Sequence, residues 1–132
     1  MKHKIHTVGS WDCRLVFCIC DQVEDAEKIL AEVFDSDEIP DIKIGGAQEA
    51  GAFLYYENWK GGVMWLPNEP KTPETISLLA HEAVHAANHI LAMSGVEFQE
   101  IRPGVVNDEP WAYLVQDIVC EFLKWTKGIK AK

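Results

Sequence analysis

Residues 72–94, TPETISLLAHEAVHAANHILAMS, decide how this chain folds, because they contain its longest run with helical spacing. Thr72 is of a residue type that caps helix N-termini, and Pro73 fits the first helical position. Ser94, followed by a glycine, is a normal C-terminal stop signal. The sequence therefore predicts a helix from Pro73 to about Met93.

Most positions of this predicted helix are apolar, and its polar side chains share one narrow stripe. The stripe contains Glu74, Ser77, His81, His85 and Asn88, with Glu82 and His89 at its edge. A helix with so many apolar positions is typical of a buried central element. Polar side chains that face inward from it need partners, because burying them unpaired costs several kcal/mol.

The five residues His81-Glu82-Ala83-Val84-His85 have the pattern HExxH. Residues four apart on a helix lie one above the other, so both imidazoles can reach one metal ion. Glu82 is rotated by about 100° from His81 and can reach a water molecule on that ion. The pattern predicts Zn²⁺ bound by His81 and His85, with Glu82 as the general base in hydrolysis. The alternative is an exposed amphipathic helix that matches the pattern by chance.

A catalytic zinc ion keeps three protein ligands and one open position, so a third ligand must come from elsewhere in the chain. We expect Glu109, which lies at the start of the next predicted helix in the stretch 107–114, NDEPWAYL. Its neighbour Asp108 is the alternative ligand, and an antiparallel helix pair would return either acid to the zinc helix. His89 is expected to lie near the metal without binding it, because it diverges by about 40° from His85 around the helix.

The motifs HEAVH (81–85) and NDEPWAYL (107–114) together resemble those of the gluzincins, the thermolysin-like and related HExxH…E peptidases. The resemblance covers roughly Ala52 to Phe122. It implies a small zincin-like fold, hydrolysis of peptide bonds, and the two motif histidines with Glu109 as zinc ligands. The chain is also similar to small phage- or prophage-encoded metallopeptidase-like proteins.

The resemblance has two departures. Asp108 could itself be the third ligand, and Tyr113 stands where thermolysin-like enzymes carry an aspartate that orients a zinc histidine. Tyr113 lies one turn after Glu109, and its phenol could donate a hydrogen bond to an oxyanion, so it is a candidate catalytic residue beside Glu82. A core aromatic is the alternative role. The segment Gly51–Tyr55 resembles the edge strand on which such peptidases bind extended substrates, with an ordinary hairpin as the alternative.

The other stretches complete an α+β fold. They predict strands at Asp12–Cys20, Asp41–Ile44, Ala52–Tyr56 and Val63–Leu66, a helix at Val23–Phe34, and a last helix from Asn107 or Asp108 to about Thr126. We expect a three- to four-stranded sheet packed on the central HExxH helix, with the third ligand on the C-terminal helix. The whole chain, 1–132, forms one minimal zincin-like domain.

Composition narrows the function further. The chain has 132 residues and a net charge of −9, which argues against nucleic-acid binding because phosphate affinity rests on clustered Lys and Arg. No apolar run reaches transmembrane length, and we expect no signal peptide because the start of the sequence is polar. The four cysteines suit reduced thiols, so a cytoplasmic location is expected. The resemblance to peptidases implies a peptide or protein substrate as the partner. The alternative function is a catalytically silent zinc-binding module that acts by binding protein.

Overall fold

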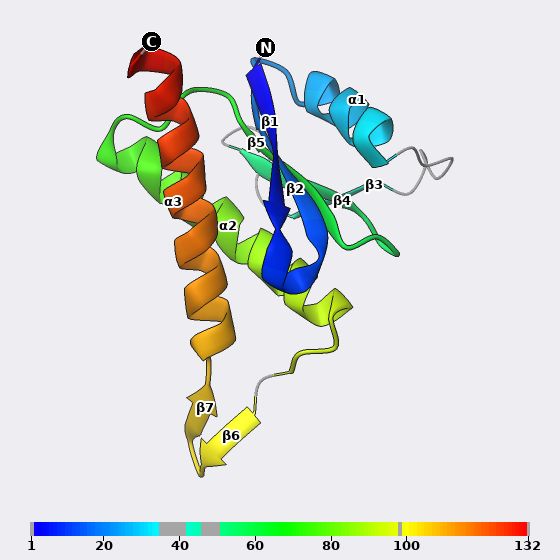
Figure 1. Cartoon of the computed structure of the whole chain (residues 1–132), viewed down its shortest axis with the longest axis vertical. Coiled ribbons are helices and arrows are strands. Elements are labelled where there is room, and N and C mark those ends of the chain that lie inside the picture. Colours follow the sequence, from blue (N-terminus) through cyan, green and yellow to red (C-terminus); the bar gives the residue numbers. More distant parts are fainter. Residues whose placement is uncertain (1, 35–41, 46–50, 98, 132) are drawn as a thin grey trace.

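The computed structural model describes residues 2–34, 42–45, 51–97 and 99–131, which form three α-helices, one 3-10 turn and two sheets (Figure 1). The helices are α1 (Val23–Phe34), α2 (Pro73–Met93) and α3 (Glu109–Ala131), and the 3-10 turn is η1 (Gly9–Trp11). The strands are β1 (Lys2–Val8), β2 (Cys13–Ile19), β3 (Ile42–Gly45), β4 (Ala52–Tyr56), β5 (Gly61–Leu66), β6 (Gln99–Arg102) and β7 (Val105–Asn107).

The main sheet has five strands in the order β1-β2-β5-β4-β3. β2 and β5 run parallel, with Val16 opposite Val63, and the other neighbours are antiparallel. The α+β class and the four expected strands are confirmed, although Asp41, the expected start of one strand, lies outside the described residues. β1 was not predicted, so the sheet exceeds the expected three to four strands. β1 reads KHKIHTV and is mostly exposed, because it pairs through its backbone at the sheet edge while little of it enters the core.

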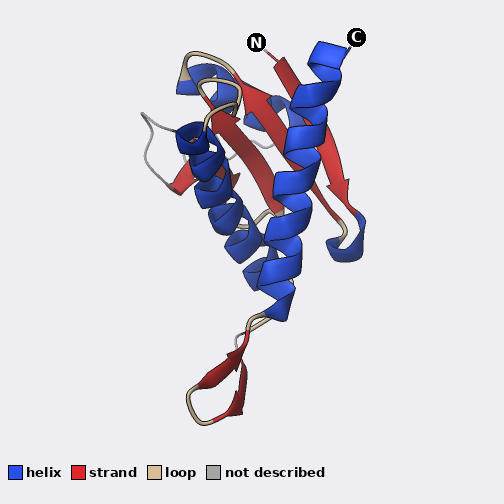
Figure 2. Ribbon diagram, turned by 90° about the vertical axis from the view of Figure 1, so that its left-hand side faces the viewer, coloured by secondary structure: helices blue, strands red, loops and turns tan. Residues whose placement is uncertain are grey.

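Helices cover both faces of this sheet (Figure 2). α1 lies on one face, where Ile29, Leu30 and Phe34 pack with strand residues such as Val16 and Leu54. α2 and α3 lie on the other face. The core therefore has two layers of side chains, one on each side of the sheet, and β2, β4 and β5 contribute alternate residues to both.

α2 begins and ends where the sequence predicts, but it is less buried than expected. Leu79, Ala83 and Ile90 face the core, whereas Val84 is 45% exposed and Ile76 is 38% exposed. The sheet covers one side of α2 and α3 covers another. The third side of α2 remains accessible, and this side carries His81.

α3 starts at Glu109, one residue after the expected start at Asn107 or Asp108, and continues five residues beyond the predicted end at Thr126. Its apolar stripe, including Leu114, Ile118 and Phe122, joins the core on the α2 side of the sheet. Before it, β6 and β7 form a two-stranded hairpin that stands away from the main sheet (Figures 1 and 2).

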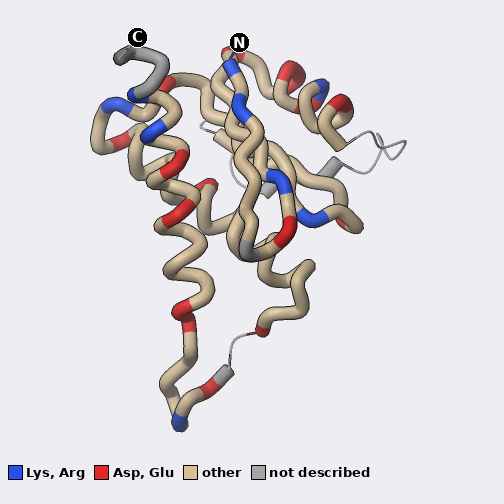
Figure 3. Tube along the Cα trace, viewed as in Figure 1, with Lys and Arg blue, Asp and Glu red and all other residues tan. Residues whose placement is uncertain are grey.

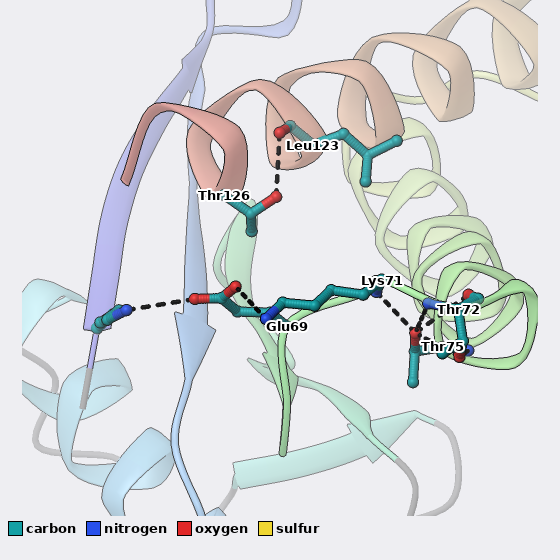
Figure 4. Close-up of polar contacts among 7 residues, drawn as sticks. Glu69, Lys71, Thr72, Thr75, Leu123 and Thr126 are labelled. Carbon is teal, nitrogen blue, oxygen red and sulfur yellow. Dashed lines mark hydrogen bonds and ion pairs between the residues drawn. The ribbon is translucent and has the colours of Figure 1, made fainter. Parts of the chain in front are cut away.

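Glu69 connects the first strand to the start of α2 (Figure 4). The Lys2 ammonium lies 3.2 Å from one Glu69 carboxylate oxygen, and the Lys71 ammonium lies 3.7 Å from the other. Thr72 then caps α2: its Oγ1 accepts a hydrogen bond from the Thr75 backbone N–H at 3.2 Å, and Thr75 Oγ1 accepts one from the Thr72 N–H at 2.9 Å. This reciprocal cap confirms the role predicted for Thr72.

Two further expectations concern the cysteines and the membrane. All four cysteines are free thiols: Cys13, Cys18 and Cys20 are buried and Cys120 is exposed. Within the part of the chain that the structure describes, no helix combines the length and apolar character needed to cross a bilayer.

Candidate metal centre

His81, Glu82 and His85 form the one group of at least three possible metal-binding side chains among the described residues. Each offers one donor atom, and these atoms lie within 4.8 Å of one another. The Nε2 atoms of His81 and His85 are 3.2 Å apart. The spacing of four residues on α2 thus brings both imidazoles together as the sequence predicts.

Glu82 is buried although it is a carboxylate. Its side chain is 2% exposed, and its Oε1 lies 3.9 Å from His81 Nε2. Its other oxygen, Oε2, is buried and has no hydrogen-bond partner. A buried polar atom without a partner is costly, so this oxygen is suited to accept a hydrogen bond from a bound water or ligand.

Burial also changes the protonation of this group. It raises the pKa of Glu82 to about 7, an effect that a backbone hydrogen bond from Phe53 partly offsets. Burial, together with the nearby charge of His81, lowers the pKa of His85. Both shifts favour neutral side chains, and neutral imidazole is the form that binds a metal ion.

The start of β4 holds Glu82 in place. A Cβ at Gly51 would lie 3.6 Å from Glu82 Cγ and 3.1 Å from the carbonyl oxygen of Trp65, and Gly51 has a φ of +151°. Glycine therefore allows the chain to pass close to Glu82. The sequence places Gly51 in the expected substrate-binding strand but gives no sign of its contact with Glu82; the available signal is a glycine directly before a strand.

His89 lies one turn after His85 on α2 and is not part of the donor group. Its ring centroid is 4.3 Å from that of Tyr55, and its Nε2 forms a hydrogen bond with the carbonyl oxygen of Trp59. His89 therefore joins α2 to β4 and to the turn that follows it. Burial lowers its pKa, so it contributes a neutral ring to this contact.

The expected third ligand, Glu109, is not part of the donor group. Glu109 and Tyr113 line a cavity of about 590 Å³ together with the end of β1. Asp108 instead lines a cavity of about 480 Å³ with Val84 and Asn88 of α2. The two acids face different elements because consecutive residues near a helix start point about 100° apart. The ligand roles of the two acids and the catalytic role of Tyr113 stay predictions, but the alternative that Tyr113 is a core aromatic is wrong, because the residue is 67% exposed.

The expectation that Gly51–Tyr55 forms an edge strand is wrong for most of its length. β3 pairs with β4 from Gly45 opposite Phe53 to Ile42 opposite Tyr56, so β4 lies inside the sheet. A substrate therefore cannot extend the sheet along these residues while β3 is in place.

No family model, curated protein or solved structure matches this chain. The chemistry of the site therefore rests on its own geometry. Two imidazoles and a carboxylate, close together and partly shielded from water, are a donor set that suits zinc and other divalent transition metals.

Proposed function

We propose that the chain is a metal-dependent hydrolase that cleaves peptide bonds, with zinc as the metal. The observation that carries this proposal is the buried Glu82 oxygen without a partner beside two imidazole nitrogens 3.2 Å apart. A purely structural helix has no reason to bury a carboxylate in that arrangement, because the burial destabilises the fold unless it serves another purpose.

In the proposed reaction the two histidines bind the metal and Glu82 transfers the proton. His81 and His85 would hold the cation, which supplies Lewis acidity when bound and so makes water more acidic and a carbonyl carbon more electrophilic. Glu82 Oε2 takes the proton from the attacking water and then passes it to the leaving amine. A pKa of about 7 suits both steps, because the group exchanges protons readily near neutral pH.

A third protein ligand would come from the start of α3. The sequence favours Glu109, whereas the placement of Asp108 in a cavity shared with Val84 and Asn88 favours Asp108, since these α2 residues neighbour the two histidines. Zinc stoichiometry and affinity of Asp108→Ala and Glu109→Ala decide between them. We expect the larger loss of affinity in Asp108→Ala.

Glu82→Gln tests the hydrolytic role. This variant keeps the shape of the side chain and should retain zinc, while hydrolysis of a peptide library should fall by at least about 100-fold because the proton acceptor is lost. The matched control is Glu74→Gln, an exposed acid on the same helix, which should keep full activity. Hydrolysis that survives in Glu82→Gln would reject the mechanism.

A metal-binding module without catalysis is the second candidate. It is favoured by the position of Glu109 and Tyr113 in a separate cavity, which leaves a ligand and an oxyanion donor unassigned at the histidine pair. Stoichiometric zinc in the purified protein, together with no cleavage of a broad peptide library, would support this role over the hydrolase.

A further inference from the structure

We propose that the cavity between the end of β1 and the N-terminal half of α3 binds an organic cation, through an alkylammonium or guanidinium group. The cavity has a volume of about 590 Å³. That volume is large for a single metal ion, and it suits an organic ligand with several carbon atoms. The proposal does not rest on the hydrolase, because no residue that lines the cavity belongs to the His81 donor group; Glu109, the zinc ligand that the sequence predicts, is the residue that both proposals test.

One wall of the cavity is a stripe of α3. Glu109, Tyr113 and Asp117 follow one another at intervals of four residues, so they share a face of the helix. The two carboxylates are about 12 Å apart along the helix axis at a rise of 1.5 Å per residue. This spacing allows two separate contacts with a linear ligand that carries two charges.

The charge of the cavity favours a cation. None of the described residues that line it is a lysine or an arginine. Figure 3 shows Asp and Glu along the N-terminal half of α3, with Lys only nearer its C-terminal end. The opposite wall adds His6, whose Nε2 lies 3.1 Å from Asp117 Oδ2 and orients that carboxylate. The His6 ring is itself held by stacking on Phe17, with centroids 5.4 Å apart.

The aromatic and apolar lining distinguishes an organic cation from a metal ion. Trp11 and Tyr113 border the cavity, and Tyr113 is 67% exposed. An ammonium or guanidinium group over the face of such a ring is attracted by the negative electrostatic potential of the ring face. Pro110 and Leu114 add apolar surface that can contact the carbon chain of the ligand. A bare divalent ion would gain little from these groups, since it needs several oxygen or nitrogen donors at short range.

The test is a titration of the metal-free full chain with 1,8-diaminooctane, followed by amide NMR. The diol of equal length, 1,8-octanediol, is the neutral control. We expect the diamine to shift resonances of β1 and α3 and to bind more weakly as salt is raised, and the diol to leave them unchanged. Equal binding of diamine and diol, or no binding of the diamine at about 10 mM, would overturn the proposal.

Variants locate the contacts. Glu109→Gln and Asp117→Asn should each weaken diamine binding about two- to fivefold, as expected for exposed ion pairs. Glu121→Gln removes an acid from the same helix outside the cavity and should leave binding unchanged. Loss of π surface in Tyr113→Leu should also weaken binding. Unchanged affinity in the Glu109→Gln/Asp117→Asn double variant, with native circular dichroism, would contradict the proposal.

A second arm identifies the source of the cation. Capped peptides with a central lysine or arginine are compared with the same peptide carrying norleucine. Peptide binding tighter than that of the diamine assigns the site to a basic side chain of a protein, and the reverse order assigns it to a free amine; both results support the cation chemistry. Glu109→Gln should also keep its zinc. A fall in zinc content would place Glu109 in the metal site and overturn its assignment to the cavity.

Discussion

At the residue scale, Glu82 shows how burial prepares a side chain for proton transfer. The helix position that points it between α2 and the start of β4 removes it from water, and one backbone hydrogen bond from Phe53 only partly replaces that water. The raised pKa therefore indicates that burying the charged form of Glu82 destabilises the folded state.

This cost predicts a pH-dependent difference in stability between the metal-free wild type and Glu82→Gln. The pKa of Glu82 is about 7 in the folded chain and 4.5 in the unfolded chain. Below about pH 4.5 the Glu82 carboxyl is protonated in both the folded and the unfolded chain, and its burial costs least. As the pH rises through about 7 the buried group must lose its proton, and this lowers the free energy of unfolding. Relative to the variant, the wild type should lose about 3 kcal/mol of unfolding free energy between those limits.

Urea unfolding of both proteins with a chelator, at about pH 5 and about pH 8, measures this difference. Comparison of the two proteins cancels the titration of His85 and His89, which both retain. A difference in unfolding free energy that does not change with pH would show that Glu82 is not held in a dry environment.

At the element scale, the parallel pairing of β2 with β5 depends on a glycine. Gly61 has a φ of +98°, and a Cβ there would collide with the carbonyl oxygen of Arg14 on the neighbouring strand. Arg14 and Gly61 are the first partners in the register of the two strands. The strands could not meet at this point if the residue carried a side chain.

Gly61→Ala should therefore destabilise the fold by at least about 2 kcal/mol, since it combines an unfavourable φ with a steric collision. Gly9→Ala is the matched control, because a Cβ at Gly9 meets nothing within 4 Å. It should change the unfolding free energy by no more than about 0.5 kcal/mol. Thermal and urea unfolding give both values, and equal effects at the two glycines would refute this account.

At the scale of the whole molecule, α3 joins the sheet to α2 through a few large side chains. Phe122 is fully buried, and its ring lies 4.9 Å from that of Phe17 on β2 and 5.4 Å from that of Trp125. The contact of Phe122 with Phe17 packs α3 against the sheet, and Leu114 and Ile118 share their core cluster with Ala83 and Ile90 of α2. These contacts consequently set the direction in which the acids at the N-terminus of α3 point.

Phe122→Ala should remove about 3–5 kcal/mol of unfolding free energy, because it leaves a cavity between α3 and the sheet. Ile101→Ala serves as the control: it also truncates an apolar side chain, but Ile101 is 69% exposed on the hairpin that stands away from the sheet. We expect it to cost no more than about 0.5 kcal/mol. Similar losses in the two variants, measured by urea unfolding, would show that α3 is not packed as described.

The parts of this protein that follow from local chemistry were predicted correctly. The bounds of α2 follow from Thr72, Pro73 and the glycine after Ser94, and the grouping of His81 with His85 follows from the pitch of one helix. β1 was not predicted, because a polar edge strand has almost no alternating apolar pattern. It forms because its backbone makes antiparallel hydrogen bonds with β2.

The sequence alone therefore determined the three α-helices, the strands β2 to β5, the HExxH spacing and the α+β class, whereas β1, β6 and β7 did not follow from it. Only the tertiary structure decided that Glu82 is buried against Gly51 and that β3 pairs with the outer edge of β4. It also decided that Glu109 and Asp108 line different cavities. The rotation of α3 about its own axis depends on how Phe122 and its neighbours pack against two other elements at once. No local pattern encodes that angle.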